Sequence, residues 1–280
     1  MFGLKPTYGR VSRAGAFPFV ESLDHVGPFA RSVADLALAF DVLHGPDSRD
    51  PVCSGRPPEP VLPGLENGIE GLRIAVASGY FSRMGLPEVF APVAAAGRAL
   101  GVTQTVEVPD VEVARAAAYV ITACEGSALH FDDLKSRPQD FDPMVVDRLL
   151  AGSMIPANWY QRAQRFRSVY RAKLAQLFES IDVFLAPATP CPAITIGQET
   201  ILLDGVEFPS RPNIGIFTQP LSFAGLPIVL APVFDAGSLP VGVQIVGAPY
   251  KDAAVLRVAR FLEKAGIAAA PVARDYEVSE

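Results

Sequence analysis

Apolar residues recur along the chain in two patterns, one typical of helices and one typical of short buried strands. The clearest helix follows Ser32, which suits the N-cap position, and stops at Gly45-Pro46. Its apolar face consists of Val33, Leu36, Ala37, Phe40 and Leu43. Similar patterns predict helices over 88–100, 111–131, 142–151, 157–179 and 252–266, the last with Gly266 as a C-cap.

Five apolar runs between these helices predict strands, in the segments 71–79, 103–109, 182–187, 226–233 and 241–249. Strands that alternate with helices indicate a layered α/β domain. Residues 46–68 carry many prolines, glycines and charges and are expected to form an irregular surface excursion. The 157–179 helix is expected to bury Phe166, Val169, Tyr170, Leu174, Leu177 and Phe178.

Composition narrows the class of protein. The 280 residues are 50% hydrophobic, enough for a large core. Pro, Gly or a charge interrupts every apolar run before it could cross a bilayer, and the start lacks the pattern of a signal peptide. The net charge of −6 and the scattered basic residues argue against binding of nucleic acid. The densest basic run, 162–173, is expected to be mostly a solvated helix face.

Cysteine and histidine give no sign of a disulfide framework, a metal site or a cofactor. Three cysteines lie far apart without CxxC spacing, which favours reduced thiols in a cytoplasmic protein. The three histidines show no ligand spacing. Gly242 and Gly247 are wrongly spaced for a dinucleotide-binding loop.

Two segments carry candidate chemistry. Asp24 and His25 are adjacent and could serve as an acid/base pair, but adjacent side chains usually point apart, so residue types favour a turn Asp beside a partly exposed His. The 211–227 segment has no regular period and mixes polar and apolar residues around Gly215 and Gly225, which suits either a small polar ligand or a satisfied internal network. No Ser lies in G-x-S-x-G or beside an evident Lys or His partner.

Several separated motifs resemble, in order, the later portion of the amidase signature enzymes. They are FGLKPTYGRVS, SLDHVGPFARSVADLALAFDVLHGPDSRDP, DVFLAPATPCPA, FTQPLSFAGLPIVLAPV and LPVGVQIVGAPYKDAAVLRVARFLE. The resemblance covers nearly the whole chain. The resemblance implies an α/β fold with a mixed β-sheet core covered by helices on both faces. Within the family, the chain most resembles hydrolases that act on small ureido or biuret-like carboxylates.

The resemblance also implies a catalytic group outside these residues. Amidase signature enzymes use a Lys, a Ser held by a cis peptide bond and a nucleophilic Ser, and all three precede the FGLKPT motif. Residues 1–280 are therefore expected to be the C-terminal portion of a single amidase domain, with the triad upstream of Met1 and no activity alone. Lys5 belongs to the GLKP motif and is not expected to be the catalytic Lys.

By resemblance, the residues present surround the substrate. Arg211 and Arg167 are expected to hold a substrate carboxylate, because Arg offers a bidentate fork. Thr218 and Gln219 are expected to bond its amide groups, and Asp24, His25 and Tyr160 to line the cleft. Tyr160 and Arg167 are seven residues apart and so share a helical face; for Arg167 an exposed salt bridge is the alternative. A small accessory subunit is an expected partner, within a homo- or hetero-oligomer.

Two other functions stay open at this point. Amidotransferase subunits that amidate Glu-tRNA share much of the pattern, but they usually carry an acidic residue shortly before the Thr that matches Thr218, and residues 214–217 contain none. A non-catalytic binding protein derived from an amidase is the other alternative.

Overall fold

The computed structural model describes residues 1–234 and 239–272. The longer helices are α1 (Val33–Leu43), α2 (Pro87–Ala99), α3 (Val111–Leu129), α5 (Pro143–Ser153), α6 (Ala157–Ser180) and α9 (Asp252–Lys264). Shorter helices are α4 (Phe131–Ser136), α7 (Ser210–Asn213) and α8 (Gln219–Ala224), with 3-10 turns η1 (Leu62–Gly64), η2 (Gly79–Ser82) and η3 (Pro138–Asp140). The strands are β1 (Phe2–Lys5), β2 (Phe29–Ala30), β3 (Ile74–Ala77), β4 (Thr105–Val106), β5 (Val183–Pro187), β6 (Thr200–Leu203), β7 (Val206–Pro209), β8 (Ile228–Val233) and β9 (Val241–Gly247).

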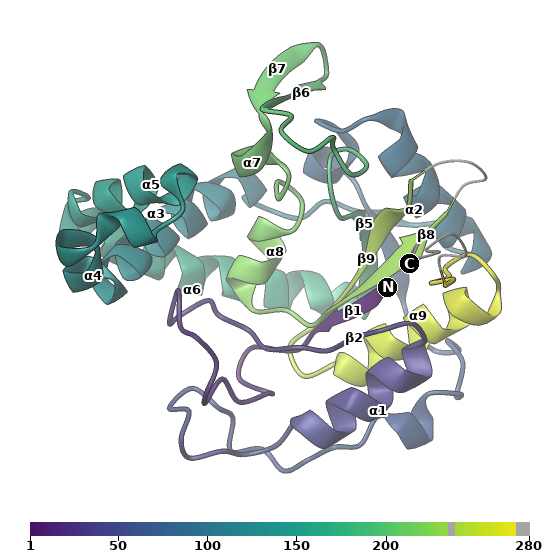
Figure 1. The fold of residues 1–280 in the computed structure, drawn as a ribbon. Helices are drawn as coiled ribbons and strands as arrows, with labels where there is room; N and C mark the ends of the chain where they lie inside the picture. Colours follow the sequence, from purple (N-terminus) through teal and green to yellow (C-terminus); the bar gives the residue numbers. More distant parts are fainter. Residues whose placement is uncertain (235–238, 273–280) are drawn as a thin grey trace, which may run out of the picture.

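Strands from both ends of the described chain build one mixed sheet. Its seven strands run in the order β2-β1-β8-β9-β5-β3-β4. The pairs from β2 to β5 are antiparallel, whereas β5, β3 and β4 are parallel. Strand β1 at the start of the chain therefore pairs with β8 more than 200 residues later, and Figure 1 shows both within the same sheet.

Helices cover both faces of this sheet, as expected. Alternate residues of β5 point to opposite faces, so Val183 and Leu185 join one core and Phe184 and Ala186 the other. The first core is closed by α1, α2 and α9, and the second by α3, α6 and α8. Helices α3, α4 and α5 extend to one side of the sheet as a lobe (Figure 1).

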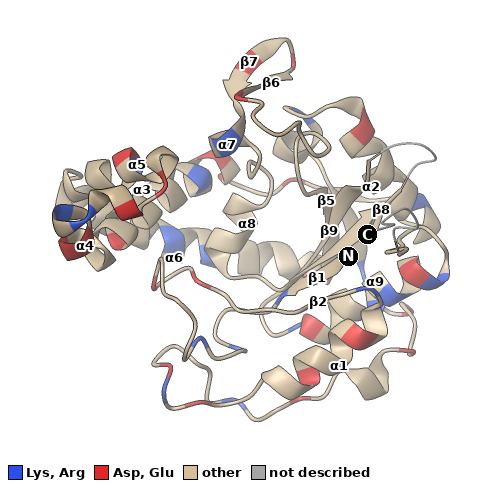
Figure 2. Cartoon of the chain, viewed as in Figure 1, with Lys and Arg blue, Asp and Glu red and all other residues tan. Residues whose placement is uncertain are grey.

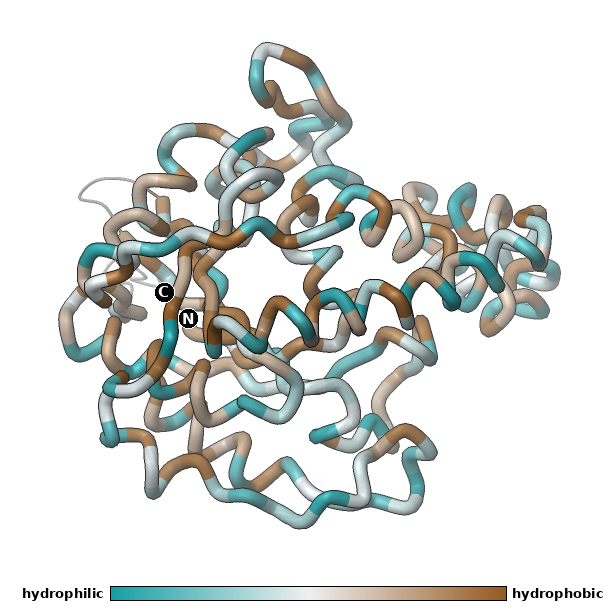
Figure 3. The backbone as a smooth tube through the Cα atoms, turned by 180° about the vertical axis from the view of Figure 1, so that it is seen from behind, coloured by the Kyte–Doolittle hydropathy of each residue, from teal (hydrophilic) through white to brown (hydrophobic). Residues whose placement is uncertain are grey.

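A two-stranded hairpin, β6–β7, stands out from the body of the molecule. Buried and exposed residues alternate along β6, and hydrophilic and hydrophobic residues follow one another around the hairpin in Figure 3. Basic and acidic residues are interspersed over the lobe and over α9, whereas the charged residues of α1 are acidic (Figure 2). Within the described residues, no helix combines the length and apolarity needed to cross a membrane.

Most predicted elements are confirmed. Ser32 caps α1 by accepting a hydrogen bond from the Asp35 N–H, and Gly266 adopts a positive φ of 71° just past α9. Residues 46–68 contain no regular element except η1. The basic run 162–173 is mostly exposed, with Arg167 as the buried exception.

Two predictions from periodicity are wrong. Val169 is 50% exposed, because α6 buries a narrower stripe than its apolar sequence suggests. The 211–227 segment is not an irregular loop, since it contains α8 and most of α7. Both helices are too short to produce an apolar period, and their stability depends on tertiary contacts.

Candidate functional site

A cavity of about 580 Å³ lies between the 13–26 loop, residues 49–51 and the C-terminal end of α3. Its polar lining includes Arg13, Asp24 and His25 from the loop and Glu125 from α3. Phe17 and Phe19 also line a neighbouring cavity of about 390 Å³ against α4 and α5, so the two cavities meet at these side chains.

Asp24 and His25 share this wall but have separate partners. Asp24 uses one carboxylate oxygen to accept the N–H groups of Phe19 and Val20, at 2.8 and 2.9 Å. The His25 ring contacts the Leu23 carbonyl through Nδ1, at 2.6 Å, and Lys5 Nζ through Nε2, at 3.3 Å. The two side chains form no acid/base pair, in agreement with the interpretation of Asp24 as a turn residue.

Lys5 and His25 form a part-buried basic pair beneath the cavity. Lys5 also donates a hydrogen bond to the Leu226 carbonyl. Burial lowers the pKa of Lys5 to about 7, with the Asp252 carboxylate opposing that change. Burial and the neighbouring Lys5 lower the pKa of His25 to about 3, so the imidazole is neutral at pH 7. One group of this pair therefore remains uncharged at neutral pH, which limits the repulsion between them.

The lowered pKa of Lys5 predicts a pH-dependent stability. A lysine in an unfolded chain has a pKa of about 10.4. Between about pH 7 and about pH 10, Lys5 is therefore protonated less often in the folded chain than in the unfolded chain. Stability should therefore rise with pH in this window. Between about pH 7 and about pH 9, the free energy of unfolding of Lys5→Met should therefore increase by about 1 kcal/mol less than that of the wild type. This figure allows for the partial exposure of Lys5 to solvent. Urea unfolding across this range is the measurement, and equal pH slopes in both proteins would contradict the assignment.

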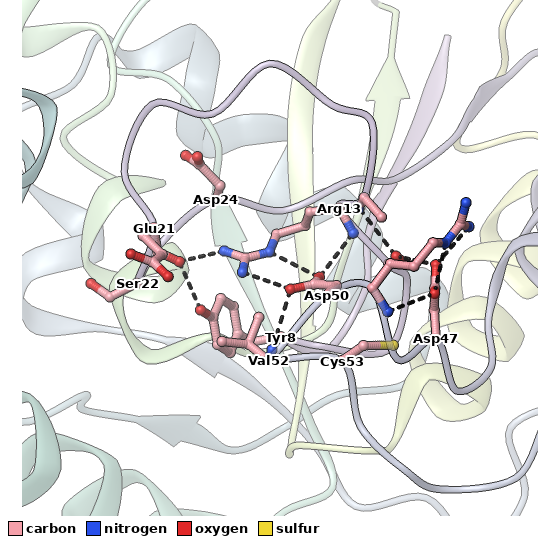
Figure 4. Close-up of polar contacts among 12 residues, drawn as sticks. Tyr8, Arg13, Glu21, Ser22, Asp24, Asp47, Asp50, Val52 and Cys53 are labelled. Atoms are coloured by element: carbon pink, nitrogen blue, oxygen red, sulfur yellow. Dashed lines mark hydrogen bonds and ion pairs between the residues drawn. The ribbon is translucent and has the colours of Figure 1, made fainter. Parts of the chain in front are cut away.

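An ion pair braces the base of the 13–26 loop. Arg13 donates to both Asp50 oxygens, at 3.1 and 2.8 Å, and to the Glu21 carbonyl. Figure 4 shows the Arg13 guanidinium between Asp50 and Glu21, with the Tyr8 ring beside it. Hydrogen bonds from Arg13 lower the pKa of Asp50 to about 2. Each guanidinium nitrogen of Arg13 therefore donates to the protein, and the side chain ties the start of the loop to Glu21 and to Asp50.

Arg167 contacts the 13–26 loop directly, whereas Tyr160 on the same helical face reaches it through Glu125 of α3. The Tyr160 hydroxyl donates to Glu125 at 2.8 Å. Arg167 is only 6% exposed and donates to the carbonyls of Ser22, at 2.6 Å, and Phe223, at 2.8 Å. Burial, aided by Arg171, lowers the pKa of Arg167 to about 10. Arg167 is thus neither an exposed salt bridge nor open to the cavity.

The other three predicted residues lie elsewhere. Arg211 is exposed on α7 and pairs with Asp142, 2.9 Å away at the border of the second cavity. The Thr218 hydroxyl donates to the Gly215 carbonyl at 3.3 Å, and Gln219 begins α8. The structure does not bring Arg211 together with Arg167, and neither Thr218 nor Gln219 lines the larger cavity.

Sequence reasoning assigned no role to Glu125, which links α3, α6 and the loop. A signal was available, because Glu125 continues the buried stripe of α3 formed by Val111, Ala114, Ala118 and Ile121. A carboxylate on a buried stripe needs hydrogen-bond donors. Within the described residues, no group of histidine, cysteine and acidic side chains is arranged to hold a metal ion.

Comparison with known proteins places the chain. The family model described as Amidase matches residues 1–256. The chain is 50% identical over 270 residues to AtzE of Pseudomonas sp. (strain ADP), a 1-carboxybiuret hydrolase subunit, covering 96% of this chain and 59% of that protein. It is 36% identical over 292 residues to the A subunit of the glutamyl-tRNA(Gln) amidotransferase of Myxococcus xanthus (strain DK1622), covering 94% of this chain and 59% of the relative.

Solved structures agree with the sequence matches. One, described as "An unexpected vestigial protein complex reveals the evolutionary origins of an s-triazine catabolic enzyme", superposes with a TM-score of 0.95 at 49% identity, over 97% of this chain and 60% of that one. A crystal structure of an amidase gives a TM-score of 0.80 at 27% identity, over 94% and 58%. The chain thus spans about 60% of the length of these relatives. On the family match and these identities, the chain belongs to the amidase signature family.

Proposed function

We propose that this chain is part of a C–N hydrolase that acts on a small amide, specifically a ureido or biuret-like carboxylate. The observation that carries the proposal is the 50% identity, over 96% of the chain, to a 1-carboxybiuret hydrolase subunit. Family membership supports hydrolysis of a C–N bond in general. The ureido carboxylate is the finer part of the proposal and needs its own test.

In this proposal the described residues bind the substrate and other residues attack it. The second Asp24 oxygen, which has no hydrogen bond to the described residues, accepts a substrate N–H. Thr218 and Gln219 bond the amide groups, and Arg211 exchanges Asp142 for the substrate carboxylate. A Ser–cis-Ser–Lys group outside these 280 residues supplies the nucleophile, because Lys5 is engaged by His25 and Leu226 rather than by a hydroxyl.

Two features of the setting belong to the same proposal. A solved relative is described as a protein complex, which supports a partner in the form of a small accessory subunit. Cys53, Cys124 and Cys191 are free thiols, which supports a reducing compartment such as the cytoplasm.

A reconstitution experiment tests the function. The chain is purified alone, and also as a chimera joined at Met1 to the part of the AtzE relative that it does not match. We expect the chimera, and not the chain alone, to release ammonia or an amine from a biuret-like carboxylate. A folded chimera that is inactive on every small amide would contradict the proposal that the protein is a hydrolase. Full turnover by the chain alone would contradict the proposal that the nucleophile lies outside these 280 residues.

Arg211 offers a prediction about substrate charge. Arg211→Ala should raise KM of the active chimera for a carboxylate substrate about tenfold or more, because a charge-assisted pair is lost. It should leave the stability nearly unchanged, since the pair with Asp142 is exposed. Steady-state kinetics on a carboxylate and its neutral amide analogue is the measurement. Equal effects on both substrates would show that Arg211 does not bind the carboxylate.

An amidotransferase subunit remains the second candidate, because relatives of that kind reach 36% identity. Ile214, Gly215, Ile216 and Phe217 provide no acidic side chain before Thr218, which disfavours it. Glutamine-dependent amidation of Glu-tRNA by the chimera with its partner subunits would favour this function over the hydrolase.

A further inference from the structure

Ser22 is held by two helices at every polar group it has. Glu125 on α3 accepts the Ser22 N–H, at 2.9 Å, and the Ser22 hydroxyl, at 2.7 Å. Arg167 on α6 donates to the Ser22 carbonyl at 2.6 Å. Ser22 directly precedes Leu23, Asp24 and His25, so its position sets the start of this part of the cavity wall.

Glu125 is the centre of this arrangement. Besides Ser22, its Oε1 accepts the Tyr160 hydroxyl at 2.8 Å and the Gln164 amide at 3.1 Å. Gln164 also donates to the Tyr160 and Ser22 hydroxyls, at 3.1 and 3.3 Å, which closes the network. No ion pair involves Glu125 in the described part of the chain, so four neutral donors satisfy the half-buried carboxylate.

The position of Glu125 connects this network to the cavity. Glu125 lines the 580 Å³ cavity on the loop side of α3 and a separate cavity of about 420 Å³ on the Tyr160 side. A carboxylate satisfied by the protein on this dividing wall has its oxygens committed to the loop and to α6. It is therefore better suited to orient the wall than to bind a ligand directly.

We propose that Glu125 is a positioning residue that, by holding Ser22, sets the place of Asp24 and His25 in the substrate-binding wall. Tyr160, Gln164 and Arg167 act with it by holding Glu125 and Ser22, so Tyr160 and Arg167 act through the loop rather than on the substrate. The link to substrate binding rests on the proposed function, whereas the restraint on the loop stands on the contacts alone.

Hydrogen exchange on the 280-residue chain tests the restraint. In Glu125→Ala we expect amide exchange in residues 19–25 to rise about tenfold or more, since Ser22 loses both acceptors. Glu125→Gln keeps one acceptor oxygen and should rescue most of this loss. Exchange in β8 and β9 should stay unchanged in both variants. Unchanged exchange of the loop in Glu125→Ala would overturn the proposal.

Glu112 provides the matched control, because it is exposed on the same helix and pairs with Arg83. Glu112→Ala should leave exchange of the 19–25 loop unchanged. If Glu125→Ala unfolds the chain, Glu125→Gln decides: a rise of about threefold confined to the loop supports the proposal, and wild-type exchange overturns it.

The active chimera adds a kinetic measurement, the separate change of KM and kcat, that would not respond if Glu125 had a purely structural role. Glu125→Gln should raise KM more than it lowers kcat, because the loop binds the substrate and the nucleophile lies elsewhere. If a variant has faster exchange in the loop but the same KM as the wild-type chimera, the loop restraint does not affect substrate binding. Failure of the proposed function would give a different result, because the chimera that carries the wild-type residues would then be inactive. Hydrogen exchange would still test whether Glu125 restrains the loop.

Discussion

Asp252→Ala is expected to lower the free energy of unfolding by about 3 kcal/mol, through the loss of buried hydrogen bonds and a buried acceptor. Asp252 is 4% exposed and accepts the Thr7 N–H and the Thr7 hydroxyl, each at 2.8 Å. Thr7 is itself 4% exposed and accepts the Tyr250 N–H at 2.8 Å. The variant would leave the Thr7 donors buried without a partner, between the end of β1 and the start of α9.

Asp252→Asn and Asp35→Ala separate the causes of this loss. The asparagine keeps one acceptor oxygen and should cost about 1 kcal/mol. Asp35 is the acidic residue in the first turn of α1, but it is exposed, so its alanine variant should cost at most about 1 kcal/mol. Urea unfolding at neutral pH measures all three. Equal losses in Asp252→Ala and Asp35→Ala would indicate a helix-terminus effect rather than a buried network.

The pH dependence of Asp252 has the opposite sign to that of a salt-bridged acid. Burial raises the pKa of Asp252, so the folded chain binds this proton more tightly than the unfolded chain. The contribution of Asp252 to stability should therefore fall as the pH rises from its unfolded pKa to its folded pKa. Asp252→Asn should lack this fall, which urea unfolding on the acid side of neutrality would detect.

Gly152→Ala is expected to cost about 3 kcal/mol, because α3 and α5 cross with their backbones in contact at this glycine. A Cβ at Gly152 would lie 2.0 Å from the Ala123 carbonyl oxygen and 2.9 Å from the Ser127 Cβ. Neither atom can move without shifting α3. Alanine is favoured over glycine in a helix by about 1 kcal/mol, which is smaller than the cost of separating two packed helices.

Thermal or urea unfolding measures this effect, with Gly55→Ala as control. A Cβ at Gly55 would meet no atom within 4 Å, so that variant should change stability by at most about 0.5 kcal/mol. Gly152→Ala should also loosen the 19–25 loop, because a displaced α3 moves Glu125 away from Ser22. A Gly152→Ala protein as stable as the wild type would mean that α3 and α5 can separate at little cost.

Elements with a long local period could be predicted from the sequence. The expected positions are confirmed for helix α1, with Ser32 as its cap, and for the apolar runs of β5, β8 and β9. A buried helix face or a wholly buried strand produces a hydrophobic pattern within a short stretch of sequence. The β6–β7 hairpin and helices α7 and α8 were not predicted. They are too short to establish a period, and α8 is held by contacts from α3 and α6.

The candidate site was predictable only in part. Spacing placed Tyr160 and Arg167 on one helical face, and the structure agrees. Their partners, Glu125 and Ser22, come from segments far away in the chain, so no local pattern could pair them. Arg211 resembled Arg167 in chemistry, yet one side chain is exposed and the other is buried.

The family, the long helices, the buried strands and the polar residues available to a site can be read from residue order alone, because local period and residue type carry that information. Which of those polar groups are already satisfied depends on the folded packing. Arg13, Tyr160 and Arg167 have their donors engaged by loops and helices distant in sequence, whereas Asp24 keeps one oxygen without a hydrogen bond to residues 1–234 or 239–272. Hydrogen bonds between distant segments depend on how the chain packs around its sheet, which residue order alone does not specify.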